Sequence, residues 1–302
     1  MTTGHARQEE CPPSDAGIRQ LWVYWEQRPD RSRPPYLDLC LETIRARLGS
    51  LTLEVVDERS ALDRLPDLDR DTWGRLPDAT RRSDYCRTRL LHAFGGLYLD
   101  ADCIALAPLE ALTEPLGAHA FVTFGAREGA VQNGMFASRR GAQFLEEWIV
   151  AQDRVLRDCP DWSTLPRTAL GEPLATAIAP RLPHHSFPER MIAPVMWFEW
   201  GRFFSRFASP DSVLRHAPLT VMLYNEFMAE PLRATSVSEL RAGTTLLSRL
   251  FRIALGESTA EDEVDVRTRL HVVADARYST YGRAVMARVR RLQGRGRPRP
   301  PA

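Results

Sequence analysis

Two short apolar runs on either side of an amphipathic segment open the patterned part of the chain. Gln20–Trp25, QLWVYW, is rich in aromatic and β-branched residues and predicts a strand. Residues 36–48 carry leucine and isoleucine at helical spacing and predict a helix, and residues 51–56 predict a second strand. This order is the first half of a Rossmann-like unit. It contains no G-x-G-x-x-G sequence, so no dinucleotide cradle is expected.

The next strong pattern is a helix, a turn and a strand. Apolar residues recur near helical spacing from Tyr85 to Phe94, and Ser83 is a candidate N-cap. Gly95-Gly96 is expected to end the helix, and the LYL run that follows predicts a short buried strand. Residues after Leu99 should therefore lie at the carboxyl end of a strand, where α/β proteins gather their ligands.

The second half of the chain predicts further strands and then helices. Asn133-Gly134 interrupts one predicted strand and indicates a bulge or a tight turn. The expected elements are strands at 120–124, 131–138 and 219–227, an amphipathic helix at 141–156, and helices at 246–255, 264–273 and 281–292. We expect a loose tail at 1–17, one α/β domain at 18–235, a helical C-terminal extension at 236–293 and a basic tail at 294–302.

Asp100 and Asp102 follow the predicted LYL strand and project to the same side in extended chain. Two adjacent carboxylates repel each other unless a cation lies between them. Hard oxygen ligands of this kind suit Mn²⁺ or Mg²⁺ carrying a phosphate. The spacing therefore predicts a site for a metal and a diphosphate.

Asp84 and Arg87 lie one helical turn apart, so both can face one ligand. Asp84 would accept hydrogen bonds from sugar hydroxyls, and Arg87 would donate to an anion. The alternative is an ion pair on a solvated helix face. The nearby Asp-x-Asp favours the ligand-binding interpretation.

The run SDYCRTRLLHAFGGLYLDAD, from Ser83 to Asp102, resembles the signature of glycosyltransferases that carry the DXD sugar-binding motif. Bacterial capsular polysaccharide synthesis proteins, fungal outer-chain mannosyltransferases and the glucosylating domains of large clostridial toxins belong to this group. The resemblance implies a GT-A type, Rossmann-like mixed sheet flanked by helices, a UDP- or GDP-sugar donor, and Mn²⁺ or Mg²⁺. It also implies retention of anomeric configuration and a role in polysaccharide biosynthesis.

The same resemblance suggests further site residues. The end of the first strand contacts the nucleotide base in relatives, so Trp22 or Trp25 would stack on it, although a strand aromatic is often core. Asn133 would hold the donor sugar, with a plain turn as the alternative. Relatives carry a histidine before a Leu-aromatic-Asn run, and here Met222 occupies that place.

Three residues near this departure are candidates for contacts at the site. His216 would replace the histidine as a metal ligand if its loop folds back, and otherwise it is a surface residue. Asn225, together with Glu226, would supply oxygen atoms to the metal or to a hydroxyl group.

Composition narrows the alternatives. The 302 residues are 44% hydrophobic and 26% charged, which is typical of a soluble globular protein, and the net charge of +1 predicts no nucleic-acid partner. Every basic residue of the Lys-plus-Arg count is arginine, which excludes enzymes that need a Schiff-base or P-loop lysine. Five scattered cysteines, no signal peptide and no long apolar run predict a cytoplasmic protein.

The C-terminal arginines bear on location. Residues 281–292 predict a basic amphipathic helix that would contact an anionic membrane surface, or alternatively a solvated helix. The expected location is therefore the cytoplasm, with peripheral contact at the inner membrane face as the alternative.

The expected activity is transfer of a sugar from a nucleotide-diphosphate donor to a glycan, lipid-linked or small-molecule hydroxyl acceptor. A non-catalytic sugar-nucleotide or polysaccharide binding protein is one alternative. A haloacid-dehalogenase-type phosphatase is another, because LDADCI also reads as a strand followed by Asp-x-Asp. Such phosphatases place the motif near the start of the domain and use a lysine, and this chain does neither.

Overall fold

The computed structural model describes residues 18–26, 33–65, 68–125 and 130–258. A six-stranded mixed sheet in the order β2-β1-β3-β6-β5-β7 forms its centre, and β4 and β8 form a second, two-stranded sheet. The strands are β1 (Gln20–Tyr24), β2 (Thr52–Val56), β3 (Gly96–Leu99), β4 (Cys103–Ala105), β5 (Phe121–Gly125), β6 (Val131–Ser138), β7 (His185–Pro188) and β8 (Thr220–Met222).

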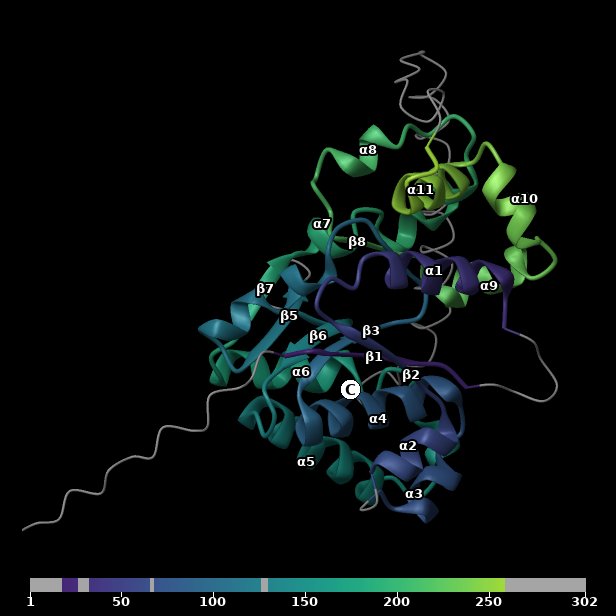
Figure 1. The fold of residues 1–302 in the computed structure, drawn as a ribbon. Coiled ribbons are helices and arrows are strands. Elements are labelled where there is room, and N and C mark those ends of the chain that lie inside the picture. Colours follow the sequence, from purple (N-terminus) through teal and green to yellow (C-terminus); the bar gives the residue numbers. More distant parts are fainter. Residues whose placement is uncertain (1–17, 27–32, 66–67, 126–129, 259–302) are drawn as a thin grey trace, which may run out of the picture.

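Helices cover both faces of the central sheet, with α1, α9 and α11 on one side and α2 to α6 on the other (Figure 1). They are α1 (Pro35–Ala46), α2 (Glu58–Arg64), α3 (Arg70–Arg75), α4 (Ala79–Phe94), α5 (Gln143–Asp158), α6 (Glu172–Ile178), α7 (Glu189–Ile192), α8 (Asp211–Leu214), α9 (Asn225–Leu232), α10 (Val237–Ala242) and α11 (Leu246–Leu255). The expected Rossmann-like mixed sheet flanked by helices is confirmed.

Strand pairing brings the carboxyl ends of β1 and β3 to one edge. β1 is parallel to both β2 and β3, whereas β3 and β6 are antiparallel, with Leu99 opposite Met135. The pairing of β5 with β6 shifts at Thr123/Phe124, across from Asn133-Gly134. The predicted bulge is therefore present within a continuous β6, and it lies beside the end of β3.

The alternation of side chains along the strands divides the core into two parts. On β1, Leu21 and Val23 pack in the cluster that includes α1 and α11, whereas Trp22 and Tyr24 pack with α4 and α5. Strand residues with a period of two must face opposite sides of a sheet. One sheet thus separates two apolar layers.

Helix α4 starts earlier than its sequence suggested. Asp78 is the N-cap, and its side chain accepts from the backbone N–H of Arg81 at 2.9 Å. The expectation of Ser83 as the cap is wrong, because the helix already begins after Asp78, more than one turn earlier, and Asp78 caps it. Gly95, with φ +70°, ends the helix as expected.

The predicted strand at 219–227 is shorter than expected. β8 ends at Met222, Tyr224 adopts a left-handed conformation with φ 59°, and Asn225 begins α9. The Leu-aromatic-Asn run therefore turns the chain from a strand into a helix instead of extending the sheet.

The region after residue 235 begins with the helices α10 and α11. The buried side chains of α11, including Leu246 and Leu250, belong to the same apolar cluster as α1 and β3. The proposed boundary between 235 and 236 remains a prediction. The expected helices at 264–273 and 281–292 and both tails lie outside the described residues. No helix in the part described is long and apolar enough to cross a membrane.

Candidate functional site

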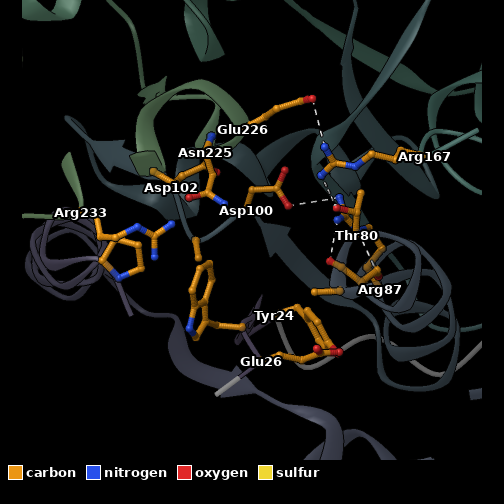
Figure 2. Close-up of a pocket in the computed structure, with 16 residues that line it drawn as sticks. Tyr24, Glu26, Thr80, Arg87, Asp100, Asp102, Arg167, Asn225, Glu226 and Arg233 are labelled. Atoms are coloured by element: carbon orange, nitrogen blue, oxygen red, sulfur yellow. Dashed lines mark hydrogen bonds and ion pairs between the residues drawn. The ribbon is translucent and has the colours of Figure 1, made fainter. Parts of the chain in front are cut away.

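One cavity of about 300 Å³ opens where β1 and β3 end. The turn after β3 supplies Asp100 and Asp102, and the end of β1 supplies Tyr24, Trp25 and Glu26. The remaining walls come from the first half of α4, from Arg167, and from α9 and the residue that follows it, Arg233. Figure 2 shows the two aspartates between the side chains of Arg233 and Arg167.

Arg87 is the central cation behind this cavity. Its side chain is only 5% exposed, and it lies between Asp84 and Asp100, with nitrogen–oxygen distances of 3.3 and 3.2 Å. Its guanidinium carbon is also 4.4 Å from the centre of the Tyr98 ring. Burial alone would lower the pKa of Arg87, but Asp100, Tyr98 and Asp84 raise it, so the group stays charged.

A chain of hydroxyl groups connects Arg87 to Asp100. Arg87 donates to Ser83 Oγ at 2.6 Å, and Ser83 Oγ lies 3.0 Å from the Tyr98 hydroxyl. Tyr98 in turn donates to Asp100 Oδ1 at 3.0 Å. Because Arg87, Ser83 and Tyr98 are buried and bonded to one another, this chain fixes the orientation of the partly exposed Asp100 carboxylate.

Asp102 is held from the other side of the sheet. Its Oδ2 accepts from the backbone N–H of Asn225, the first residue of α9, at 2.5 Å. The Asn225 side chain accepts from the Tyr36 hydroxyl on α1. The partial positive charge at a helix N-terminus stabilises a carboxylate placed there.

The two carboxylates form a cation-binding arrangement. Burial and the charge of Asp100 raise the pKa of Asp102 to about 6, and burial also raises the pKa of Asp100. A divalent cation would remove this penalty, and carboxylate oxygens suit Mn²⁺ or Mg²⁺, so the residues fit such an ion. No third His, Cys, Asp or Glu joins them among the residues described. Phosphate oxygens and water would supply further ligands, and a contact of Asn225, which lines the same cavity, with the ion remains a prediction.

Asp84 and Asn133 lie behind the cavity, next to Arg87. Asn133 Nδ2 donates to Asp84 Oδ1 at 2.9 Å, and the Asn133 carbonyl accepts from Arg87 at 2.5 Å. The Asp84 side chain is 3% exposed, and burial raises its pKa to about 7. The structure thus brings Asp84, Arg87, Asp100 and Asn133 together. A direct contact of Asp84 or Asn133 with a sugar remains a prediction.

Of the two candidate tryptophans, only Trp25 lines the cavity. Trp22 is 3% exposed, donates through Nε1 to the Gly95 carbonyl at 2.9 Å, and contacts Phe94. The suggestion that Trp22 stacks on a nucleotide base is wrong, because the strand alternation turns it into the core under α4. Trp25 follows the last residue of β1 and faces the cavity.

His216 is not brought to the aspartates. It lies after the short helix α8, where its Nε2 is 3.1 Å from Arg190 and 3.3 Å from Arg215. The prediction that His216 is the third metal ligand is therefore wrong. In the described part of the chain, no His, Cys, Asp or Glu completes a group of three with the aspartates. Burial lowers the pKa of His216, and the charges of Arg190 and Arg215 lower it further. His216 therefore lies in a cluster of basic residues and not at the aspartates.

Arg167, Glu226 and Arg233 line the cavity as well. Arg167 donates to Thr80 at 2.8 Å and pairs with Glu226 at 3.0 Å. Arg233 pairs with Glu230 at 3.1 Å. The sequence had suggested Glu226 but not the two arginines, which stand outside the periodic segments and far from the motif along the chain.

Residues 39–122 match the family model described as glycosyltransferase sugar-binding region containing DXD motif, and this segment includes Asp84, Arg87, Asp100 and Asp102. A comparison with curated proteins gave no match. The matched segment covers less than half of the chain.

Several solved glycosyltransferases are distantly similar. The PaToxG glycosyltransferase is 12% identical, with a TM-score of 0.40 over 89% of this chain and 87% of that one. The galactosyltransferase LgtC, solved with donor and acceptor sugar analogues, is 14% identical, with a TM-score of 0.44 over 81% and 98%. GlyE of Streptococcus pneumoniae TIGR4 is 11% identical, with a TM-score of 0.45 over 79% and 60%.

Proposed function

We propose that this protein transfers a sugar from a nucleotide-diphosphate donor to a hydroxyl acceptor with a divalent cation. The match of residues 39–122 to a glycosyltransferase sugar-binding region supports this proposal. The observation that carries this proposal is the pair of carboxylates, Asp100 and Asp102, facing one cavity at the ends of β1 and β3. The donor is a UDP- or GDP-sugar. The acceptor is a glycan, a lipid-linked saccharide or a small molecule.

Asp100 and Asp102 would hold Mn²⁺ or Mg²⁺ on the donor diphosphate. The ion would supply charge stabilisation for the departing nucleoside diphosphate. The protein groups keep both carboxylates oriented: Arg87 and Tyr98 act on Asp100, and the N-terminus of α9 acts on Asp102. Pre-oriented charges of this kind lower the barrier without reorganisation during the reaction.

Trp25 supports a nucleotide at the other end of the cavity. Its side chain lines the cavity beside Tyr24 and Glu26, and Glu26 is fixed by the Tyr24 hydroxyl at 2.6 Å and by Arg82 at 2.9 Å. An aromatic face suits a base through stacking. A retaining outcome is part of the proposal and rests on the family resemblance.

Donor hydrolysis tests the function. We expect release of UDP or GDP from a panel of nucleotide sugars to need Mn²⁺ or Mg²⁺ and to stop with EDTA. Asp102→Asn should lower turnover about 100-fold or more, because charge stabilisation by a metal contributes several kcal/mol. Asp38→Asn, which changes an exposed carboxylate on α1 paired with Arg33 at 2.5 Å, serves as the matched control. Turnover that survives both chelation and Asp102→Asn would contradict the proposal.

A further inference from the structure

Arg87 is engaged inside the protein by three hydrogen bonds and two ion pairs. Its Nε donates to the Ser83 carbonyl at 3.2 Å. One terminal nitrogen contacts the Asn133 carbonyl at 2.5 Å and Asp100 at 3.2 Å, and the other contacts Ser83 Oγ at 2.6 Å and Asp84 at 3.3 Å. All three nitrogen atoms of the guanidinium therefore already contact oxygen atoms of the protein. A phosphate could bind Arg87 only by displacing one of them.

Two other arginines reach the same cavity from its rim. Arg167 precedes α6 and is 53% exposed, and Arg233 follows α9 and is 38% exposed. Their carboxylate partners, Glu226 and Glu230, are 62% and 84% exposed. Exposed ion pairs of this kind contribute little, so exchanging such a partner is easy.

The two arginines stand on opposite sides of the aspartates. Figure 2 shows Arg233 beside Asp102 and Asn225, and Arg167 on the far side of Asp100, joined to Glu226 by a dashed line. A diphosphate on a cation held by Asp100 and Asp102 would lie between them. Arginine forms two parallel hydrogen bonds to phosphate oxygens, which suits it to this position.

We propose that Arg167 and Arg233, and not Arg87, bind the diphosphate of the donor, and that Arg167 leaves Glu226 to do so. This inference rests on the proposed function. Thr80, whose hydroxyl accepts from Arg167 at 2.8 Å, keeps the guanidinium at the cavity when Glu226 is released. Glu226 is then a competitor for Arg167, and Arg87 is a positioning residue for Asp84 and Asp100.

The exchange predicts opposite effects for the two members of one ion pair. Arg167→Ala should weaken binding of UDP and GDP about 10-fold or more, because a charge-assisted hydrogen bond is lost, and Arg233→Ala should do the same. Glu226→Gln should tighten binding about 2- to 5-fold, because the competing exposed pair is removed. A purely structural bridge would make both partners of the pair weaken binding.

The experiment is calorimetric titration of the full chain with UDP, GDP and inorganic pyrophosphate in the presence of Mn²⁺. Arg181→Ala is the matched control, since Arg181 is 62% exposed, pairs with Glu147 at 2.8 Å and lies away from this cavity. Thermal unfolding of each variant shows whether the fold is kept. Pyrophosphate isolates the anion contact from any contact with the base.

Three results would overturn the inference. These are wild-type affinity in both arginine variants, weaker binding in Glu226→Gln, and no binding of any of the three probes to the wild-type protein. If the arginine variants bind normally while Asp102→Asn abolishes metal-dependent hydrolysis, this assignment fails and the proposed function stands. If hydrolysis also survives chelation, the proposed function fails as well.

Discussion

The Asp100 carboxylate shows how a residue at the end of a strand is fixed by groups from elsewhere in the fold. Tyr98, two residues before Asp100, packs in the apolar layer that includes α4, and its hydroxyl donates to Asp100 at 3.0 Å. The sequence shows Asp100 and Asp102 at a strand end. It does not show the chain from Arg87 through Ser83 to Tyr98, which forms only when α4 packs on β3.

We expect Tyr98→Phe to weaken the site without disturbing the core. The ring stays packed against Phe136, but the hydroxyl bonds to Asp100 and Ser83 are lost. The free energy of unfolding should fall by about 1 kcal/mol. Turnover should also fall, and by more than the small loss of folded protein would cause, because Asp100 loses its orientation.

Urea denaturation and donor hydrolysis check this prediction. Tyr85→Phe is the control, since Tyr85 is a buried tyrosine on α4 that stacks with Arg89 instead of bonding Asp100. Unchanged turnover in Tyr98→Phe would refute the orienting role.

The sequence predicted most helices and strands because their signals, such as spacing of apolar residues and turn glycines, lie within short segments. The turn at Gly95-Gly96 follows from backbone requirements: Gly96 has φ +113°, and a Cβ there would lie 2.5 Å from the Gln20 carbonyl oxygen. At Gly134, in the bulge, a Cβ would instead meet side chains, 2.1 Å from Met222 Cε and 2.9 Å from Asp100 Oδ2. By contrast, Trp22 and Trp25 look alike in sequence, and only the register of β1 places one in the core and the other at the cavity. Arg167 and Arg233 lie in segments without a periodic pattern. Their positions at the same cavity depend on tertiary packing, which the sequence does not show.

The turn before α6 should be sensitive to a single methyl group. In Gly171→Ala the new Cβ would lie 2.3 Å from Asn133 Nδ2 and 2.8 Å from Asp84 Oδ2. We expect the unfolding free energy to fall by about 1–3 kcal/mol, together with loss of activity, since the Asn133–Asp84 bond must move. Gly74→Ala, a helical glycine of α3 with nothing within 4 Å, should instead stabilise by up to about 1 kcal/mol. Equal effects in the two variants would argue against the clash.

The N-cap of helix α2 makes the free energy of unfolding depend on pH. Asp57 is its N-cap, accepting from the Ser60 N–H at 2.9 Å and donating its own N–H to Ser60 Oγ at 2.8 Å. The bonds from Ser60 lower the pKa of Asp57. Its stabilisation is therefore complete above the unfolded pKa of about 3.9 and is lost as the pH falls through the lower folded value.

Asp57→Ala should lower the unfolding free energy by about 1 kcal/mol at pH 7. The difference from the wild type should shrink as the pH is lowered below about 4. Asp57→Asn keeps a good cap and should show a smaller loss at pH 7. Urea denaturation at several pH values measures this, and a loss that does not vary with pH would exclude the carboxylate as its cause.

At the scale of the molecule, α11 joins the layer that contains α1 and β3. Leu250 is fully buried in this cluster, so Leu250→Ala should lower the unfolding free energy by about 2–5 kcal/mol. We expect one cooperative transition in which tryptophan fluorescence and circular dichroism coincide. Val150→Ala, at a 53% exposed position of α5, is the control and should change little. Two separate transitions would instead support an independent extension after residue 235.

Residues from both sides of the central sheet line the cavity. The layer below supplies Arg87 and Ser83, and the layer above supplies Asn225 and Arg233. Because the two walls of the cavity come from different elements, one wall can change in evolution while the other is kept. Substitutions on α9 and its flanks can change which molecule is accepted, while the charged assembly under α4 stays intact. A designer seeking a new substrate preference would therefore vary the rim formed by α9 first and leave α4 unchanged.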